Sequence, residues 1–207
     1  GQLVDPFKGQ QDIEHKVLRT VGNPEERFEE DALRLMRAAR LVAELGFALD
    51  TDTASAIQKK AHNLGHISKE RIRDEFVRIL SSSQPMMALV LCQQLGLLEY
   101  IAPDLLRGIG IDQNQAHSYT VFEHNLRAMQ HAADKGWDFD LRLAALFHDI
   151  SKPETRRRSE EKNDWTFHGH EVVGSRVTKK ALEDLKFSRE TIEKVSKLVR
   201  WHMFFSD

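Results

Sequence analysis

Hydrophobic residues recur at intervals of three and four along nearly the whole chain. This spacing places apolar side chains on one face of an α-helix and predicts a helical body. Alternation with a period of two, which is typical of strands, is confined to residues 1–20. The pattern therefore predicts an all-α fold with strand-like character only at the beginning. One apolar stripe is made by Phe28, Ala32, Leu35, Ala39 and Val42.

Capping and breaking residues divide this pattern into separate helices. Asn23 followed by Pro24 is typical of a helix start, and Gly46 is expected to end the helix that they open. Thr120 and Glu123 have the spacing of a capping box, which predicts another helix start. We expect further helices over residues 51–63, 69–81, 84–95, 98–107, 120–133, 140–149, 170–185 and 189–205, a linker over 108–118 and a polar loop over 151–168.

Length and composition limit the class of protein. A chain of 207 residues, 41% of them hydrophobic, can bury a core and suggests one large or two small domains. The net charge of −2 gives no overall positive field, so any contact with RNA must come from local basic patches.

The lone Cys92 follows an apolar run, which predicts a buried, unpaired thiol and a reducing cytoplasm. No stretch approaches the roughly 20 apolar residues of a membrane helix, and we expect a cytoplasmic protein with no membrane segment.

The first candidate site is a charged motif on the helix predicted over residues 23–46. Asp31 and Arg34 are three residues apart, and Arg37 and Arg40 continue the spacing. They could form a solvated face with ion pairs. Alternatively, an Asp that accepts from an exocyclic amine, beside the rigid donor fork of an Arg, could bind the edge of a nucleobase. Spacing alone leaves both interpretations open.

The second candidate site is a group of histidines around a His-Asp pair. It comprises His124, His148, Asp149, His170 and His202. Imidazole nitrogens together with a carboxylate suit divalent ions such as Mn²⁺, Ni²⁺ or Zn²⁺ better than Ca²⁺. We predict that the side chains of His124, His148 and Asp149 converge to within roughly 3–5 Å beside a cavity that could admit a phosphate.

The first motif belongs to a longer pattern. Asp5-Pro6-Phe7-x-Gly9 and the run from Arg19 to Arg40 resemble the end of the head and the start of the neck in class II CCA-adding enzymes and their poly(A) polymerase relatives. The resemblance implies that Asp31 and Arg34, with Arg37 beside them, bind the base of an incoming CTP or ATP.

A later segment, Glu70 to Glu75, resembles the family motif that buttresses the neck, although an exposed charged helix face is the alternative. The same resemblance implies that Lys69, Arg71 and Arg73 contact the acceptor stem of tRNA.

The second motif resembles HD phosphohydrolases through Leu146 to Pro153 and Phe167-x-Gly169-His170-Glu171, with Ser151 where that family usually carries glycine. In those enzymes a metal-bound water attacks a phosphate ester. The resemblance implies metal ligands at His124, His148 and Asp149, with His170 and His202 for a second metal or a phosphate. Lys152 would supply catalytic positive charge. The usual fourth ligand is a later Asp, for which Asp207 is the candidate.

Together the two resemblances predict the end of a nucleotidyltransferase head over 1–22, a helical neck that binds RNA and nucleotide over 23–110, and a truncated HD domain over 116–207. Nucleotide addition needs head carboxylates that hold two Mg²⁺ ions. We expect them before Gly1, so this chain by itself should not extend tRNA. The whole enzyme would add or repair the 3′-CCA end with CTP and ATP; A-adding, CC-adding and poly(A) specificities, and a homodimer, stay open.

Two other functions remain as alternatives. One is a non-catalytic tRNA-binding module with a degenerate HD scaffold. The other is a stand-alone HD nucleotidase or phosphodiesterase, against which the run from Asp5 to Arg40 argues. Three consecutive arginines, residues 156–158, lie near Trp165 and Phe167 in the sequence. They could contact phosphates, or they could form a solvated loop that Glu160 and Glu161 neutralise.

Overall fold

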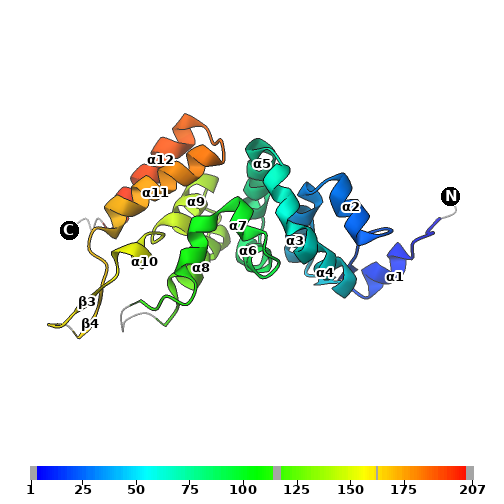
Figure 1. Cartoon of the computed structure of the whole chain (residues 1–207), viewed down its shortest axis with the longest axis horizontal. Helices are drawn as coiled ribbons and strands as arrows, with labels where there is room; N and C mark the ends of the chain where they lie inside the picture. Colours follow the sequence, from blue (N-terminus) through cyan, green and yellow to red (C-terminus); the bar gives the residue numbers. More distant parts are fainter. Residues whose placement is uncertain (1–3, 114–117, 162, 204–207) are drawn as a thin grey trace. The chain divides into compact units, whose positions relative to one another are not determined.

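The protein is described by a computed structural model that covers residues 4–113, 118–161 and 163–203. The chain forms two compact units, Gly1–Tyr100 and Ile101–Asp207. Figure 1 shows that helices make up most of each unit. The all-α prediction is therefore confirmed. No helix among these residues is both long enough and apolar enough to cross a membrane.

The first unit is built around one buried helix. Its helices are α1 (Gly9–Glu14), α2 (Pro24–Glu30), α3 (Leu33–Leu45), α4 (Thr51–Lys60), the 3-10 helix η1 (Ala61–His66), α5 (Lys69–Ser81) and α6 (Pro85–Gln94), while α7 (Leu98–Ile101) spans the boundary between the units. Leu35, Met36 and Ala39 of α3 are fully buried. This helix packs against α5 and α6, so the core of the unit lies between them. Cys92 of α6 is also fully buried, and burial raises the pKa of its thiol to about 12.

The strand-like character predicted for residues 1–20 is largely wrong for the described residues. Only Val17–Leu18 form a strand, β1, which pairs in parallel with β2 (Ala48–Leu49). The preceding residues form α1, because the Asp5 carboxylate accepts hydrogen bonds from the backbone N–H groups of Gly9 and Gln10 at 2.7 and 3.0 Å. Such capping satisfies donors that have no partner inside the helix.

The single helix predicted over residues 23–46 is also interrupted. Asp31 has an extended backbone, with φ −152° and ψ 101°, and separates α2 from α3. Its Oδ1 accepts a hydrogen bond from the backbone N–H of Leu33 at 3.1 Å. A side chain that competes in this way for a backbone donor favours a helix end over a helix interior. All five residues of the predicted apolar stripe are nevertheless buried, so the interruption redirects the chain without exposing the core.

The second unit consists of packed helices and one hairpin. The helices are η2 (Pro103–Gly108), α8 (Val121–Asp134), α9 (Phe139–Phe147), α10 (Lys152–Thr155), α11 (His170–Asp184) and α12 (Arg189–Trp201). α8 packs on α9, and α11 packs on α12. The predicted capping box at Thr120 and Glu123 is confirmed, because each side chain binds the backbone N–H of the other residue.

The polar loop predicted over residues 151–168 contains regular structure. α10 begins there, and β3 (Arg157–Ser159) pairs antiparallel with β4 (Asp164–Thr166). Pro153 in the first turn of α10 suits a helix start. The two strands are short and carry mainly polar residues, so they lack the apolar alternation by which a strand is predicted from sequence.

Candidate functional site

Four histidines and one aspartate converge in the second unit. His124 lies in the first turn of α8, and His170 begins α11. His148 and Asp149 follow the last residue of α9, and His202 follows the last residue of α12. The ends of separate helices therefore bring together residues that lie up to 78 positions apart in the sequence.

One half of this cluster contains the three residues predicted to converge. The Nε2 atoms of His124 and His148 are 3.0 Å apart, and each lies 3.2 Å from Oδ2 of Asp149. The prediction that these side chains meet is confirmed.

The other half contains the two later histidines. The Nε2 atoms of His170 and His202 are 3.2 Å apart and lie 3.3 and 3.5 Å from Oδ1 of Asp149. Each half presents three ligand atoms that lie within 4.8 Å of one another. Asp149 thus offers one carboxylate oxygen to each pair of histidines.

The backbone orients three of the four rings. In each, Nδ1 lies beside the carbonyl oxygen of the residue three positions earlier, and a carbonyl can only accept a hydrogen bond. In the neutral ring, Nδ1 then carries the proton and Nε2 presents its lone pair to the cluster. The contacts are His148 to Ala145 at 2.8 Å, His170 to Phe167 at 2.7 Å, and His202 to Val199 at 2.7 Å.

This arrangement fits one or two divalent ions. Lone pairs that face each other at about 3 Å repel unless positive charge lies between them, as a metal site provides. Oδ1 of Asp149 is buried and has no hydrogen-bond partner, and a bound cation would give this oxygen a partner. Burial raises the pKa of Asp149, but the N–H donors and positive charge that the four imidazoles supply when protonated outweigh it and lower the pKa below its ordinary value. The carboxylate is therefore in the ionised form that a metal requires.

Lys152 lies against the same carboxylate. Its Nζ is 2.7 Å from Oδ2 of Asp149 and donates a hydrogen bond of 2.7 Å to Oε1 of Gln113. Only 9% of Lys152 is exposed, so its charge is held beside the cluster. Gln113 was not predicted as part of the site, since it lies within the predicted linker and has no ligand-type side chain.

Ser151 is a second contributor whose role the sequence did not indicate. Its hydroxyl is buried and donates a hydrogen bond of 2.6 Å to the backbone carbonyl of His170. That bond connects the residues after α9 to the first turn of α11. A Cβ atom added at Gly174 would lie 3.3 Å from the Ser151 hydroxyl, so α11 approaches the start of α10 closely at this point.

Two cavities open beside the cluster. One, of about 750 Å³, has His148 and His202 in its wall together with Trp137 and Trp201. The other, of about 560 Å³, has His170 in its wall and lies between β4 and α11. The prediction of a cavity beside the cluster is therefore confirmed. The candidate fourth ligand, Asp207, lies outside the described residues.

In the first unit, the carboxylate of Asp31 pairs with Arg71 and not with Arg34, the arginine three residues later in the sequence. Nη2 of Arg71, from α5, lies 3.1 Å from both oxygens of Asp31, whereas the Arg37 guanidinium is 4.0 Å away. Arg34 binds Glu30 at 2.7 Å and the carbonyl oxygen of Arg27 at 3.0 Å. Asp31 and Arg71 line a cavity of about 500 Å³ with Asn63 and His66.

Glu75 is buried, with 2% exposed, and joins the helices around Asp31. Its carboxylate accepts a hydrogen bond of 2.6 Å from Nε of Arg40, while Arg37 and Arg78 approach to 3.8 and 3.7 Å. The buttress interpretation of this segment therefore accounts for Glu75 better than an exposed face does.

The three residues predicted to bind RNA do not form one patch. Lys69 donates a hydrogen bond to the carbonyl oxygen of Tyr100, Arg71 pairs with Asp31, and Arg73 pairs with Asp74. Residues two apart on a helix point in nearly opposite directions, so Arg71 leaves α5 on a different side from the other two.

Comparisons with known proteins found one family match in the first part of the chain and another in the second unit. The family described as "Probable RNA and SrmB- binding site of polymerase A" matches residues 46–108, and the HD domain matches residues 121–207. The A-adding tRNA nucleotidyltransferase of Deinococcus radiodurans is 37% identical over 98% of this chain and 48% of its own length. The CC-adding tRNA nucleotidyltransferase of Thermus thermophilus is 36% identical over 98% and 48%.

A solved structure gives the same result. The Bacillus stearothermophilus CCA-adding enzyme in complex with CTP superposes with a TM-score of 0.56 at 28% identity, covering 95% of this chain and 40% of that one. The chain spans about half the length of the curated relatives that it matches. The two family matches and these relatives show that the chain is similar to about half of a tRNA nucleotidyltransferase of the kind that includes the CCA-adding enzymes.

Proposed function

We propose that this chain is the neck and HD region of an enzyme that completes or repairs the 3′ end of tRNA with CTP and ATP, and that its HD cluster is a metal-dependent phosphohydrolase centre. The observation that carries the second part is that Asp149 offers one oxygen to each of two histidine pairs. A degenerate scaffold has no need for a buried carboxylate surrounded by four imidazoles and Lys152, because burying charged groups is costly even when they are paired. The unpaired, buried Cys92 supports a cytoplasmic location.

Each residue of the cluster has a separate task in this proposal. His124, His148 and Oδ2 of Asp149 would hold one divalent ion, such as Mn²⁺, Ni²⁺ or Zn²⁺, and Oδ1 with His170 and His202 a second. When bound, such ions polarise a phosphate and lower the pKa of a coordinated water. Lys152 adds positive charge that favours a phosphate and keeps the Asp149 carboxylate in place.

A 2′,3′-cyclic nucleotide is a suitable test substrate. Water forms a bond to phosphorus, one ring P–O bond breaks, and the ribose oxygen that leaves takes the proton. We expect the purified chain, after incubation with Mn²⁺, Ni²⁺ or Zn²⁺ and gel filtration, to retain up to two ions and to hydrolyse this substrate.

The two halves of the cluster should be separable by substitution. We expect His124→Ala to lose the ion of the first half and His202→Ala that of the second, so each variant retains one ion fewer by elemental analysis. His131→Ala, which removes an exposed histidine of the same unit, serves as the control. A chain that retains no ion and hydrolyses nothing would support the tRNA-binding scaffold instead.

The neck is proposed to select the nucleotide through Asp31 and Arg34, with Arg37 beside them. The cavity at Asp31 supports this, because it places an acceptor carboxylate where a base edge could lie. In the structure the Asp31 carboxylate contacts Arg71 and the Arg34 guanidinium contacts Glu30. Binding a base would therefore exchange these individually weak surface ion pairs for base contacts.

This proposal predicts the effect of Arg34→Ala in a protein of the relatives' full length. A bidentate base contact contributes about 1–3 kcal/mol of discrimination, so the preference between CTP and ATP should change by roughly 5- to 150-fold. Competition between the two nucleotides in a tRNA extension assay measures it. Arg19→Ala, which removes an arginine paired with Asp12, is the control. An unchanged preference would mean that Arg34 is only a surface charge.

A further inference from the structure

The cavity between β4 and α11 has a lining that suits more than a bare phosphate. Trp165 and Phe167 contribute aromatic rings, His168 and Met203 lie at its exposed part, and His170 connects it to the metal-type cluster. Its volume of about 560 Å³ lies within the range of small-ligand sites. Of these lining residues the proposed metal centre uses His170 alone, so it does not explain why aromatic rings line the rest of the cavity.

The adjoining hairpin places arginines on the same aromatic ring. In the β3–β4 register Arg158 is opposite Trp165, and Arg156 lies two residues earlier, directly before β3. The guanidinium carbon of Arg156 is 3.7 Å from the centre of the Trp165 ring, and that of Arg158 is 5.6 Å from it. Stacking of this kind holds the positive charges in place while leaving their N–H donors directed to other ligands.

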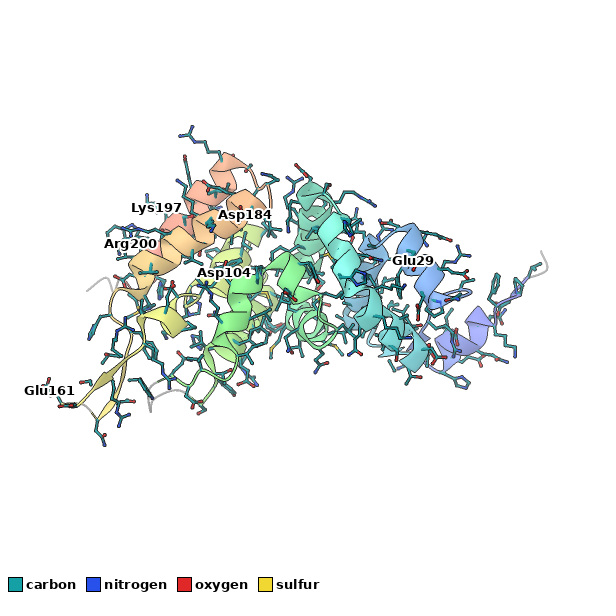
Figure 2. The ribbon with its side chains drawn as sticks, in the orientation of Figure 1. Glu29, Asp104, Glu161, Asp184, Lys197 and Arg200 are labelled. Carbon is teal, nitrogen blue, oxygen red and sulfur yellow. The ribbon has the colours of Figure 1, made fainter. Side chains whose placement is uncertain are left out.

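These positive charges are not neutralised within the part of the chain that the structure describes. No carboxylate there lies within 4.0 Å of the guanidinium nitrogens of Arg156, Arg157 or Arg158. Arg157 donates hydrogen bonds to backbone carbonyls, and Arg158 donates one to Asn163. Nε of Arg156 is buried and has no hydrogen-bond partner. Figure 2 shows Glu161 at the far end of the hairpin, so neutralisation by the acidic turn does not account for these arginines.

We propose that this hairpin face and cavity bind the end of a single RNA strand. The terminal base enters the cavity against Trp165 and Phe167, and phosphates of the strand contact Arg156 and Arg158, so that the terminal phosphate ester lies on the His170 side of the cluster. Alternating arginines and aromatic rings are typical of single-strand binding, because bases stack on the rings while guanidinium groups bind phosphates. A base must leave its own stack to enter the cavity, which excludes a continuous duplex. The delivery of an ester to the cluster rests on the proposed phosphohydrolase function, whereas the binding does not.

The test measures binding of the 207-residue chain to a fluorescein-labelled hexaribonucleotide with a 3′-phosphate, by anisotropy in EDTA at several salt concentrations. We expect Arg156→Ala with Arg158→Ala to weaken binding about tenfold at low salt. The slope of log Kd against log salt should fall by about 1.4, because each phosphate contact on a single strand contributes about 0.7. Trp165→Ala should weaken binding by roughly tenfold with the slope unchanged, since stacking is not ionic.

Matched variants make the result specific to the hairpin. Trp165→Phe keeps an aromatic ring and should restore part of the affinity. Arg189→Ala removes an exposed arginine of the same unit that is paired with Glu193, and it should bind RNA as the parent chain does. Positive charges of the first unit contribute equally in all variants, so differences between them report the hairpin.

The outcomes separate this inference from the phosphohydrolase proposal. The inference is overturned if the parent chain does not bind the hexamer, or if the hairpin variants bind it as tightly as the parent. Those results leave hydrolysis of a small cyclic nucleotide untouched. Conversely, a chain that binds the hexamer through the hairpin but hydrolyses nothing would support the RNA site and contradict the phosphohydrolase proposal.

Discussion

Asp149→Asn is expected to abolish the retention of divalent ions and, with it, any hydrolysis of a 2′,3′-cyclic nucleotide. The Asp149 carboxylate is shared by both halves of the cluster, so its loss affects both proposed ions at once. Replacing a residue that only supports a metal ligand typically costs 10- to 100-fold in affinity or activity, and losing a shared ligand should cost more than about 100-fold.

The asparagine variant retains the size of the side chain, which keeps the surrounding helices packed. One oxygen remains, but the amide nitrogen now faces the imidazoles and cannot bind a metal. Elemental analysis after gel filtration measures the ions, and circular dichroism checks the fold. Asp184→Asn, at the exposed end of α11 and labelled in Figure 2, is the control that should retain the ions. Two ions retained by the Asp149 variant would contradict the assignment of the cluster.

Glu75→Ala is expected to lower the free energy of unfolding of the first unit by about 3 kcal/mol, the lower end of the cost of breaking a buried ion pair. Glu75 is 2% exposed and its partner Arg40 is held at 2.6 Å. Without the carboxylate, the described carboxylate that still contacts Arg40 is that of Glu44, and Arg37 and Arg78 lose an acidic neighbour. The lower end applies because Arg40 is 17% exposed and partly solvated.

Urea denaturation followed by far-UV circular dichroism measures this effect. All three tryptophans lie in the second unit, so tryptophan fluorescence reports on that unit separately. Glu70→Ala removes an exposed carboxylate from the first turn of the same helix and should cost less than about 1 kcal/mol. Equal stability of the Glu75 and Glu70 variants would show that Glu75 does not buttress the neck.

The sequence predicted those residues of the site whose side chains are metal ligands by their chemical type. His124, His148 and Asp149 were predicted because imidazoles and a carboxylate are metal ligands wherever they occur. Gln113 and Ser151 could not be predicted, since an amide and a hydroxyl become part of the site only through neighbours 39 and 19 residues away. The same limit applies to Arg71, whose partner Asp31 lies 40 residues earlier.

Local sequence determined the helices, because the spacing of apolar residues and the capping residues act over one or two turns. It failed at Asp31, where a side-chain hydrogen bond to Leu33 outweighed the helical pattern and ended α2. It also failed at the β3–β4 hairpin, whose polar strands pair through their backbones and leave no apolar alternation to detect.

The sequence by itself therefore determined that this chain is helical and that it carries metal-type ligands and base-reading residue types in a family pattern. Only the tertiary structure decided that Asp149 is shared between two histidine pairs and that Arg156 stacks on Trp165. The physical reason is that these contacts depend on where the ends of separate helices and strands meet. Such distances are fixed by core packing between elements, whereas local sequence fixes each element alone.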